Sequence, residues 1–355
     1  MRSERLVKII CELLISTSHF SLLKLNFNPQ NILIINFGQI GDVVLSLPAL
    51  KAVREKFFDA RITAMIGKSG AEIIEISGFV DEKITVDRVK LRDGEKINSI
   101  KEVLRIAKNV RRRKFDFVID LHSLYETNFL GFLSGAKHRL YANRENRSLD
   151  FLAKFSPQPP REDKKLHLTD HYLNVLKPLG IENAARFVEI QPRTKDLEKV
   201  ENLLRACEAK KLIGLFPGAG NPSRRWSLDK FAETAAELSQ DKNTRTIVFL
   251  GPEEKDLRGE IEGKLSGETL IIDNLSLLEF VTALSKLSVL ISNDTSAIHL
   301  GAIVGTPIIL VMDKRAPTTY LPLAEKIRLV NNDTIDKIKT DEVLRATREM
   351  LEIKG

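Results

Sequence analysis

The chain has 355 residues, of which 43% are hydrophobic and 29% are charged, a balance that excludes a disordered or fibrous protein. A formal charge of +7 favours anionic partners, such as phosphorylated small molecules, acidic membrane surfaces or nucleic acid. Only Cys11 and Cys207 and six scattered histidines are present, so neither a disulfide framework nor a Cys-based zinc site can be built, and a reducing compartment fits.

Residues 1–30 precede the first predicted strand, and the apolar stretch 6–15 within them carries Lys8 and Glu12. The stretch is too short and too charged to cross a membrane, and Glu12 interrupts the apolar core that a signal peptide needs. Its apolar side chains share one helical face, with arginine and lysine nearby. Two interpretations stay open: an amphipathic helix on a membrane surface, or a helix that packs on the body of the protein.

From residue 31 onward, strand and helix patterns alternate. Continuous apolar runs predict buried parallel strands in the first half, and helical periodicity predicts the helices between them. These strands are expected at 32–36, 61–66 and 115–120, and these helices at 43–57, 98–112 and 171–179. The proline-rich residues 156–165 predict a loop within this half.

The alternation restarts after a boundary near Gln191–Thr194. Strands are expected at 212–216, 246–250, 270–272, 289–291 and 308–311, and helices at 227–238 and 341–351. The fold class is therefore α/β, with two doubly wound Rossmann-like domains over residues 31–193 and 194–355, the second of which ends in a C-terminal helix. Ligands of such sheets bind beyond the carboxyl ends of the strands, so two facing domains would enclose a cleft.

The first strand leads into a glycine loop, in which Gly38 and Gly41 allow a ligand to approach the backbone. Their spacing is not the dinucleotide-binding fingerprint. Asp42 begins the next helix, either as a first-turn carboxylate that complements the helix dipole or as a general base. Asp120 and His122 follow the strand at 115–120, and we count them among the substrate-binding residues.

A second glycine loop, residues 217–226, follows the strand at 212–216. Small residues at Gly218 and Ala219 bring the backbone close to a ligand, and the adjacent Arg224 and Arg225 match phosphate oxygens. A solvated surface role for the two arginines remains the alternative. Trp226, the one tryptophan, is expected in the core.

Glu253 and Glu254 follow the strand at 246–250, where their carboxylates suit ribose hydroxyls or form a plain charge pair at a helix start.

The stretch 293–300 reads as a strand end, a tight polar turn and a helix start. Asp294 or Thr295 can cap this helix, and the next backbone amides can then bind an anion. Asp294 would hold sugar hydroxyls, while the amides of Thr295, Ser296 and Ala297 would bind phosphate oxygens. An ordinary capped helix after a buried strand is the alternative.

Two basic runs, 101–114 and 137–147, lie in the first half. They indicate solvated faces or a polyanionic partner of that half. Aromatic residues are not interleaved with them, so nucleic acid is not expected as a partner.

Four motifs in this order resemble the heptosyltransferase family of glycosyltransferases, which transfer heptose from ADP-heptose to the lipopolysaccharide core. The resemblance covers about residues 31–320. It rests on 32–35 with Gly41-Asp42-Val43-Val44-Leu45-Ser46-Leu47-Pro48-Ala49-Leu50, on 115–122, on Pro217-Gly218-Ala219 with Arg225-Trp226, and on Asn293-Asp294-Thr295 with His299-Leu300 and Gly305-Thr306-Pro307.

The resemblance implies a GT-B fold, with the acceptor in the first domain and the nucleotide sugar in the second. It implies inverting transfer without a metal or another cofactor, with Asp42 as the base. The family's phosphate-binding lysine corresponds to Arg224 here. His299 and Ser296 lie in the family's Asp-Thr motif, where glycine is often found in place of Ser296. Val311-Met312-Asp313 stands where the family often has Phe-Gly-Pro.

The implied donor is ADP-heptose, and the implied acceptor is an anionic glycolipid, the lipopolysaccharide inner core. The enzyme is then expected in the cytoplasm, at the inner face of the inner membrane. Two alternatives remain: another GT-B nucleotide-sugar enzyme, such as a different glycosyltransferase or an epimerase, and a two-lobed solute-binding protein. The sequence does not reveal which core position accepts the sugar or how many copies of the chain assemble.

Overall fold

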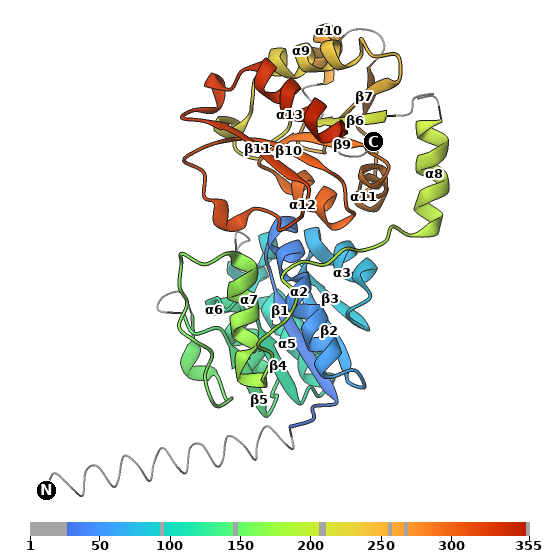
Figure 1. Cartoon of the computed structure of the whole chain (residues 1–355). Coiled ribbons are helices and arrows are strands. Elements are labelled where there is room, and N and C mark those ends of the chain that lie inside the picture. The colour runs from blue at the N-terminus through green and yellow to red at the C-terminus, as the bar shows by residue number, and fades with distance from the viewer. Residues whose placement is uncertain are drawn as a thin grey trace, which may run out of the picture. The chain divides into compact units, whose positions relative to one another are not determined.

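A computed structural model describes residues 27–92, 96–144, 148–205, 211–254, 258–265 and 269–352. The helix predicted within residues 1–30 lies outside these ranges up to residue 26, as do Cys11 and Cys207. The chain divides into two compact units: residues 46–186 with those up to Gln39, and Phe187 onward with Ile40–Leu45. Each unit is an α/β body built on its own parallel sheet (Figure 1).

The first unit holds a five-stranded parallel sheet in the order β3-β2-β1-β4-β5. Its strands are β1 (Asn31–Asn36), β2 (Arg61–Gly67), β3 (Glu82–Val86), β4 (Phe117–Asp120) and β5 (His138–Tyr141). Its helices are α2 (Ile40–Lys56), α3 (Ala71–Ser77), α4 (Arg88–Arg92), α5 (Lys96–Arg112), α6 (Tyr125–Leu133) and α7 (Leu168–Leu176).

The central strands of this sheet are those whose sequence is mainly apolar. In β1, Ile32 to Ile35 are all buried, because α-helices cover both faces of a parallel sheet. Ile32 stands opposite Ile62 of β2 on one side and opposite Phe117 of β4 on the other. The predicted strands at 32–36, 61–66 and 115–120 are thereby confirmed, whereas β3 and β5 were not predicted.

The second unit holds a six-stranded parallel sheet in the order β11-β10-β9-β6-β7-β8. Its strands are β6 (Lys211–Phe216), β7 (Thr244–Phe249), β8 (Leu270–Ile272), β9 (Val289–Asn293), β10 (Ile308–Asp313) and β11 (Ile327–Asn332). Its helices are α8 (Thr194–Leu204), α9 (Leu228–Leu238), α10 (Arg258–Lys264), α11 (Leu277–Ser285), α12 (Ser296–Ile303) and α13 (Thr340–Glu352).

Trp226 anchors the core of the second unit. Its side chain is 1% exposed, its indole N–H donates to the carbonyl of Ile338 at 3.1 Å, and its ring meets Phe231 of α9 edge-on. A buried indole needs such a partner for its N–H, because leaving that donor without one in an apolar core is costly. The expectation that Trp226 lies in the core is confirmed.

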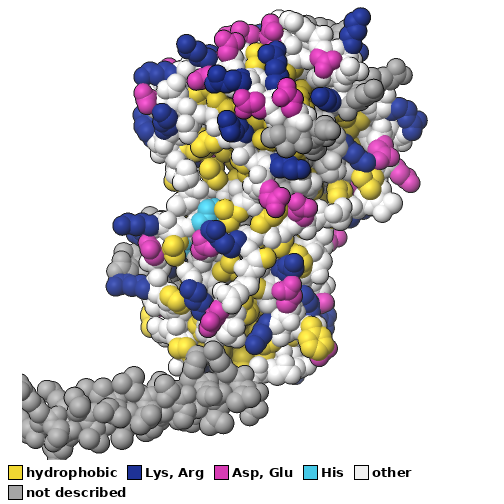
Figure 2. Space-filling model, viewed as in Figure 1, with side chains coloured by type: hydrophobic (Ala, Val, Ile, Leu, Met, Phe, Trp, Pro, Cys, Tyr) yellow, Lys and Arg dark blue, Asp and Glu magenta, His cyan; other side chains and the backbone are white. Residues whose placement is uncertain are grey.

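Acidic and basic side chains are interspersed over the face of each unit shown in Figure 2. In the part of the chain that is described, no helix is long and apolar enough to cross a membrane.

Candidate active site

The sheet order brings three predicted loops of the second unit to one edge. Strands β9, β6 and β7 are neighbours, and all pair in parallel, so their carboxyl ends lie side by side. The loop 217–226 follows β6, Gly251 to Glu254 follow β7, and Asp294 follows β9. Residues that are separated by up to 80 positions in the sequence therefore form one candidate site.

Asn293, the last residue of β9, attaches the loop 217–226 to the sheet. Its side-chain amide donates to the carbonyl of Pro217 at 2.7 Å, and its side-chain oxygen accepts the backbone N–H of Trp226 at 3.0 Å. The side chain is completely buried. Both ends of the loop are thus held by one residue, which the sequence analysis placed in a motif without giving it a role; a buried amide at a strand end was the available signal.

Within this loop, Arg224 reaches Asp294. The guanidinium Nη1 lies 3.1 Å from the carboxylate Oδ2, and the arginine side chain remains about half exposed. Burial raises the pKa of the Asp294 carboxyl, and the charge of Arg224 acts in the opposite direction. The pair places a cation with free surface next to a carboxylate, which is a combination that suits a phosphorylated sugar.

A second carboxylate, that of Glu254, packs so closely against Gly218 that a side chain would not fit there without a shift. A Cβ at this position would come within 2.4 Å of the Glu254 carboxylate, which is itself buried and accepts the N–H of Gly251 at 3.1 Å. Burial raises the pKa of Glu254, and the charge of the exposed Glu253 raises it further. Arg225 partly offsets this shift, and its Nε donates to the carbonyl of Ala219 at 2.8 Å.

Helix α12 starts at the same edge of the sheet. Thr295 occupies the N-cap position with extended backbone angles, and its side chain makes no capping hydrogen bond. Ser296 and Ala297 form the first turn, in which backbone N–H groups lack acceptors within the helix. His299, one turn further on, is buried with only 7% of its surface exposed.

Gly38 lies in the connection between β1 and α2, whereas Asp42 lies in α2, within the residues Ile40–Leu45 that belong to the second unit. The N–H of Gly38 donates to the side-chain oxygen of the buried Asn36 at 2.9 Å, which shapes the turn. Helix α2 begins at Ile40, three residues earlier than predicted, so Gly41 and the partly buried Asp42 belong to its first turn. A carboxylate at this position interacts favourably with the helix dipole.

Asp120 ends β4 and organises the loop that follows it. One carboxylate oxygen accepts the N–H groups of His122 and Ser123 at 3.1 and 2.8 Å, and the other accepts the side chain of Asn128 at 2.8 Å. The side chain is fully buried, and this burial raises its pKa to about 7 despite the hydrogen bonds. A direct contact between Asp120 and a substrate stays a prediction.

His122 lies in this loop close to two arginines. Its pKa is lowered to about 3, mainly by burial and also by the charges of Arg144 and Arg88. Arg144 pairs with Glu162 at 3.1 Å in a small crevice that Arg161 and His171 also line. Residues beyond the carboxyl ends of β3, β4 and β5 therefore include several cations beside Glu162, of which only Arg144 belongs to a predicted basic run.

An apolar cavity of about 680 Å³ opens near the carboxyl ends of β1 and β4. Phe37, which follows β1, and Tyr125 and Phe129 of α6 are among its walls, and Arg88 and Glu126 are its charged members. Among the described residues, no group of three or more His, Cys, Asp or Glu side chains is arranged to hold a metal ion.

A family model described as glycosyltransferase family 9 (heptosyltransferase) matches residues 103–347. The chain is 20% identical over 287 residues to the lipopolysaccharide core heptosyltransferase OpsX of Haemophilus influenzae, a match that covers 79% of this chain and 78% of that protein.

Two solved structures share the fold. One is a family 9 glycosyl transferase of Veillonella parvula, with a TM-score of 0.80 and 21% identity over 92% of this chain and 98% of that one. The other is the Escherichia coli heptosyltransferase WaaC with ADP, with a TM-score of 0.73 and 17% identity over 90% of this chain and all of that one. The predicted GT-B fold is confirmed. Because the family model spans well over half of the sequence, the chain belongs to glycosyltransferase family 9, the heptosyltransferases.

Proposed function

We propose that this glycosyltransferase moves heptose from ADP-heptose to an anionic glycolipid of the lipopolysaccharide inner core, with inversion and without a metal. The observation that carries the donor assignment is the Arg224–Asp294 pair at the carboxyl ends of β6 and β9. Arg224 would bind the diphosphate of the donor, and Asp294 would accept hydrogen bonds from the sugar hydroxyls. A relative of the same fold has been solved with ADP, which supports the nucleotide.

We assign the acceptor to the first unit because basic side chains gather at the carboxyl ends of the strands of that unit. Arg88 and Arg144 act electrostatically on His122 at the carboxyl ends of the strands, and Arg161 lines the same crevice as Arg144. Arginine forks bind carboxylates and phosphates, the charged groups of an anionic glycolipid. The name of the Haemophilus influenzae relative points to the same acceptor class.

The reaction needs one base and a stabilised leaving group. We assign the base to Asp42, which takes the proton of the acceptor hydroxyl as that oxygen bonds to the anomeric carbon. The bond from this carbon to the diphosphate breaks, and ADP leaves with the electron pair. Arg224, together with Arg225 and the amides at the start of α12, would stabilise the negative charge that develops on the diphosphate.

The expected site of action is the cytoplasmic face of the inner membrane, with peripheral attachment. The proposal rests on the sequence of residues 1–25, where an apolar stripe is flanked by positive charge. These residues lie outside the described ranges.

The assignment of Asp42 is tested with Asp42→Asn. We expect turnover of ADP-heptose with a core glycolipid acceptor to fall by about 10²–10⁴-fold, while the affinity for ADP is nearly kept, because only the proton transfer is lost. Glu55→Gln is the matched control, since Glu55 is an exposed carboxylate of the same helix. Near-normal turnover by a folded Asp42→Asn protein would exclude this role, and loss of activity in a chelator would exclude a metal-independent reaction.

A further inference from the structure

The first unit contains another cavity, at the amino ends of its strands, whereas Asp120 and His122 lie at the carboxyl ends. Its volume is about 440 Å³, and it is lined by Phe27, which precedes β1, by Phe57 at the end of α2 and by His138 at the start of β5. Strand β4 separates the two places, since Phe117 at its amino end contacts Phe27 while Asp120 ends it. A ligand in this cavity would not compete with a sugar substrate at the carboxyl ends.

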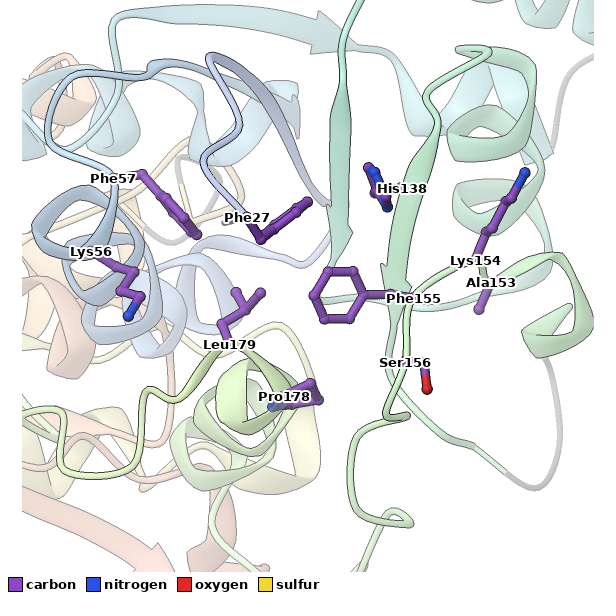
Figure 3. Close-up of a pocket in the computed structure, with 10 residues that line it drawn as sticks. All are labelled: Phe27, Lys56, Phe57, His138, Ala153, Lys154, Phe155, Ser156, Pro178 and Leu179. Carbon is purple, nitrogen blue, oxygen red and sulfur yellow. The ribbon is translucent and has the colours of Figure 1, made fainter. Parts of the chain in front are cut away.

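Aromatic rings form the walls of the cavity. The ring of Phe27 packs edge-on against Phe117, His138 and Phe155 at centroid distances of 4.9, 5.0 and 5.1 Å. Phe27, Phe57, Phe155 and Leu179 face a common space in Figure 3. Such walls offer apolar surface with few polar partners, so the cavity favours a hydrocarbon chain over a sugar or a nucleotide.

The charged residues in the lining are basic. Lys56 and Lys154 are lining residues, whereas the described lining residues include no Asp or Glu. Lys137 and Lys177 directly precede the lining residues His138 and Pro178, and all four lysines are exposed.

Two of these lysines affect the pKa of His138. Burial lowers the pKa of His138, and Lys137 and Lys154 lower it further. Asp116 acts in the opposite direction, but its carboxylate also accepts the backbone N–H groups of Gln30 and Asn31 at 2.8 and 3.2 Å. An apolar lining with lysines in and next to it complements a molecule with a hydrocarbon chain and an anionic head.

Two large apolar side chains next to this region are exposed to solvent. Phe58 directly follows the lining residue Phe57 and is 74% exposed, and Phe151, two residues before the lining residue Ala153, is 80% exposed. Exposed aromatic side chains together with lysines are typical of surfaces that enter the interface of a bilayer.

We propose that this cavity binds an acyl chain of an anionic membrane phospholipid, whose charged head would lie beside the lysines of its lining. The site would hold the first unit on an acidic leaflet independently of the assignments made for Asp42 and the donor. Chain and headgroup contribute together, since apolar burial and attraction to acidic lipids add in peripheral binding.

The test uses the full chain with vesicles of phosphatidylcholine that contain or lack phosphatidylglycerol, and with cis-parinaric acid as a fluorescent acyl probe. We expect the double variant Lys56→Glu/Lys154→Glu to bind the acidic vesicles about tenfold less tightly or weaker still. The matched control is Lys242→Glu/Lys326→Glu, which makes the same change of charge at exposed lysines of the second unit. The control should retain most of the vesicle binding.

The acyl chain is tested separately with Ala153→Phe, which places a larger apolar side chain in the lining while the lysines remain. We expect the parinaric acid signal of the parent chain to be lost in this variant, with thermal unfolding and ADP binding unchanged. If Ala153→Phe proves unstable, Ala153→Leu serves as a milder filling of the same space that should weaken the probe's binding. The proposal is overturned if the parent chain does not bind the probe, or if the Lys56/Lys154 variant and its control bind acidic vesicles equally.

Discussion

The ion pair between Arg224 and Asp294 joins two side chains that are 70 positions apart in the chain. The carboxylate of Asp294 pairs with the guanidinium of Arg224 at the edge of the sheet. In the proposed donor site, a diphosphate would offer Arg224 a more highly charged partner, and Asp294 would then be available to sugar hydroxyls. The pair therefore explains how one small site could hold both halves of a nucleotide sugar.

Arg224→Ala is expected to lower kcat/KM by about 10²–10³-fold, by analogy with the loss of one donor from an oxyanion-binding site. Arg225→Ala is expected to lower kcat/KM by a similar factor, because it removes a charge proposed to stabilise the diphosphate as well as the hydrogen bond to the Ala219 carbonyl. The control is Arg328→Ala, an arginine on β11 whose side chain is 61% exposed and pairs with Glu349. Steady-state kinetics with ADP-heptose decide: full activity and nucleotide affinity in both Arg224→Ala and Arg225→Ala would show that the phosphate site lies elsewhere.

His122 provides a prediction for pH. Its pKa is about 3 in the folded chain against a usual value of 6.5, because burial and the nearby arginines disfavour the charged ring. Between these two values the unfolded chain binds more protons, so the free energy of unfolding falls as the pH drops from 6.5 toward 3. One such group contributes at most about 1.4 kcal/mol per pH unit.

His122→Gln removes this contribution and leaves the other titrating groups in place. In urea denaturation at pH 5, 6 and 7, the free energy of unfolding of the parent chain should therefore rise more steeply with pH than that of the variant. The difference between the two should level off above pH 6.5. Parallel curves for the two proteins across this range would contradict a neutral, buried His122.

At the scale of elements, loop geometry in the second unit depends on the end of β9. Asn293 carries two hydrogen bonds that hold Pro217 and Trp226, so the Gly218 turn and Arg224 between them are kept at the sheet edge. A carbonyl and an N–H that lose such a partner inside the protein each cost about 1–3 kcal/mol.

Asn293→Ala is accordingly expected to lower the free energy of unfolding by about 2–4 kcal/mol and to weaken ADP binding. Ser223→Ala, in an exposed position of the same loop, should change stability by no more than about 0.5 kcal/mol. Chemical denaturation and ADP titration of the three proteins provide the comparison. A stable Asn293→Ala protein with parental ADP affinity would refute this role.

The strands that the sequence predicted differ in composition and in place within the sheet from those that it did not predict. The apolar strands β1, β6, β9 and β10 lie inside their sheets and are buried on both faces. The strands that were not predicted are β3, β5 and β11, which form sheet edges and contain charged or polar residues. An edge strand meets solvent, so its composition does not mark it as a strand.

At the scale of the whole molecule, the donor and acceptor assignments fall on separate units, and membrane attachment falls on the first. Removing residues 1–25 should weaken flotation with acidic vesicles while ADP binding persists, because the donor residues belong to the second unit. The remaining attachment should be sensitive to salt, as expected for lysine contacts to acidic lipids. Equal flotation of a stable truncated chain, or no flotation of the full chain, would refute an anchor in residues 1–25.

The sequence by itself was sufficient for the α/β class, the parallel sheets, the glycine loops and the family, because these depend on local patterns and on the order of motifs. The family match begins at residue 103, so the role of Asp42 still rests on the resemblance and on its place at the start of α2.

Only the tertiary structure decided which predicted residues meet and in what chemical state. Strand order brings Arg224 to Asp294 and Glu254 to Gly218, contacts that no sequence spacing encodes. Burial gives Asp120 a pKa of about 7 and His122 one of about 3, and the side chain of Asn293 holds both ends of the loop 217–226. These properties arise from desolvation and from neighbours far away in the chain, and both exist only after the sheets have formed.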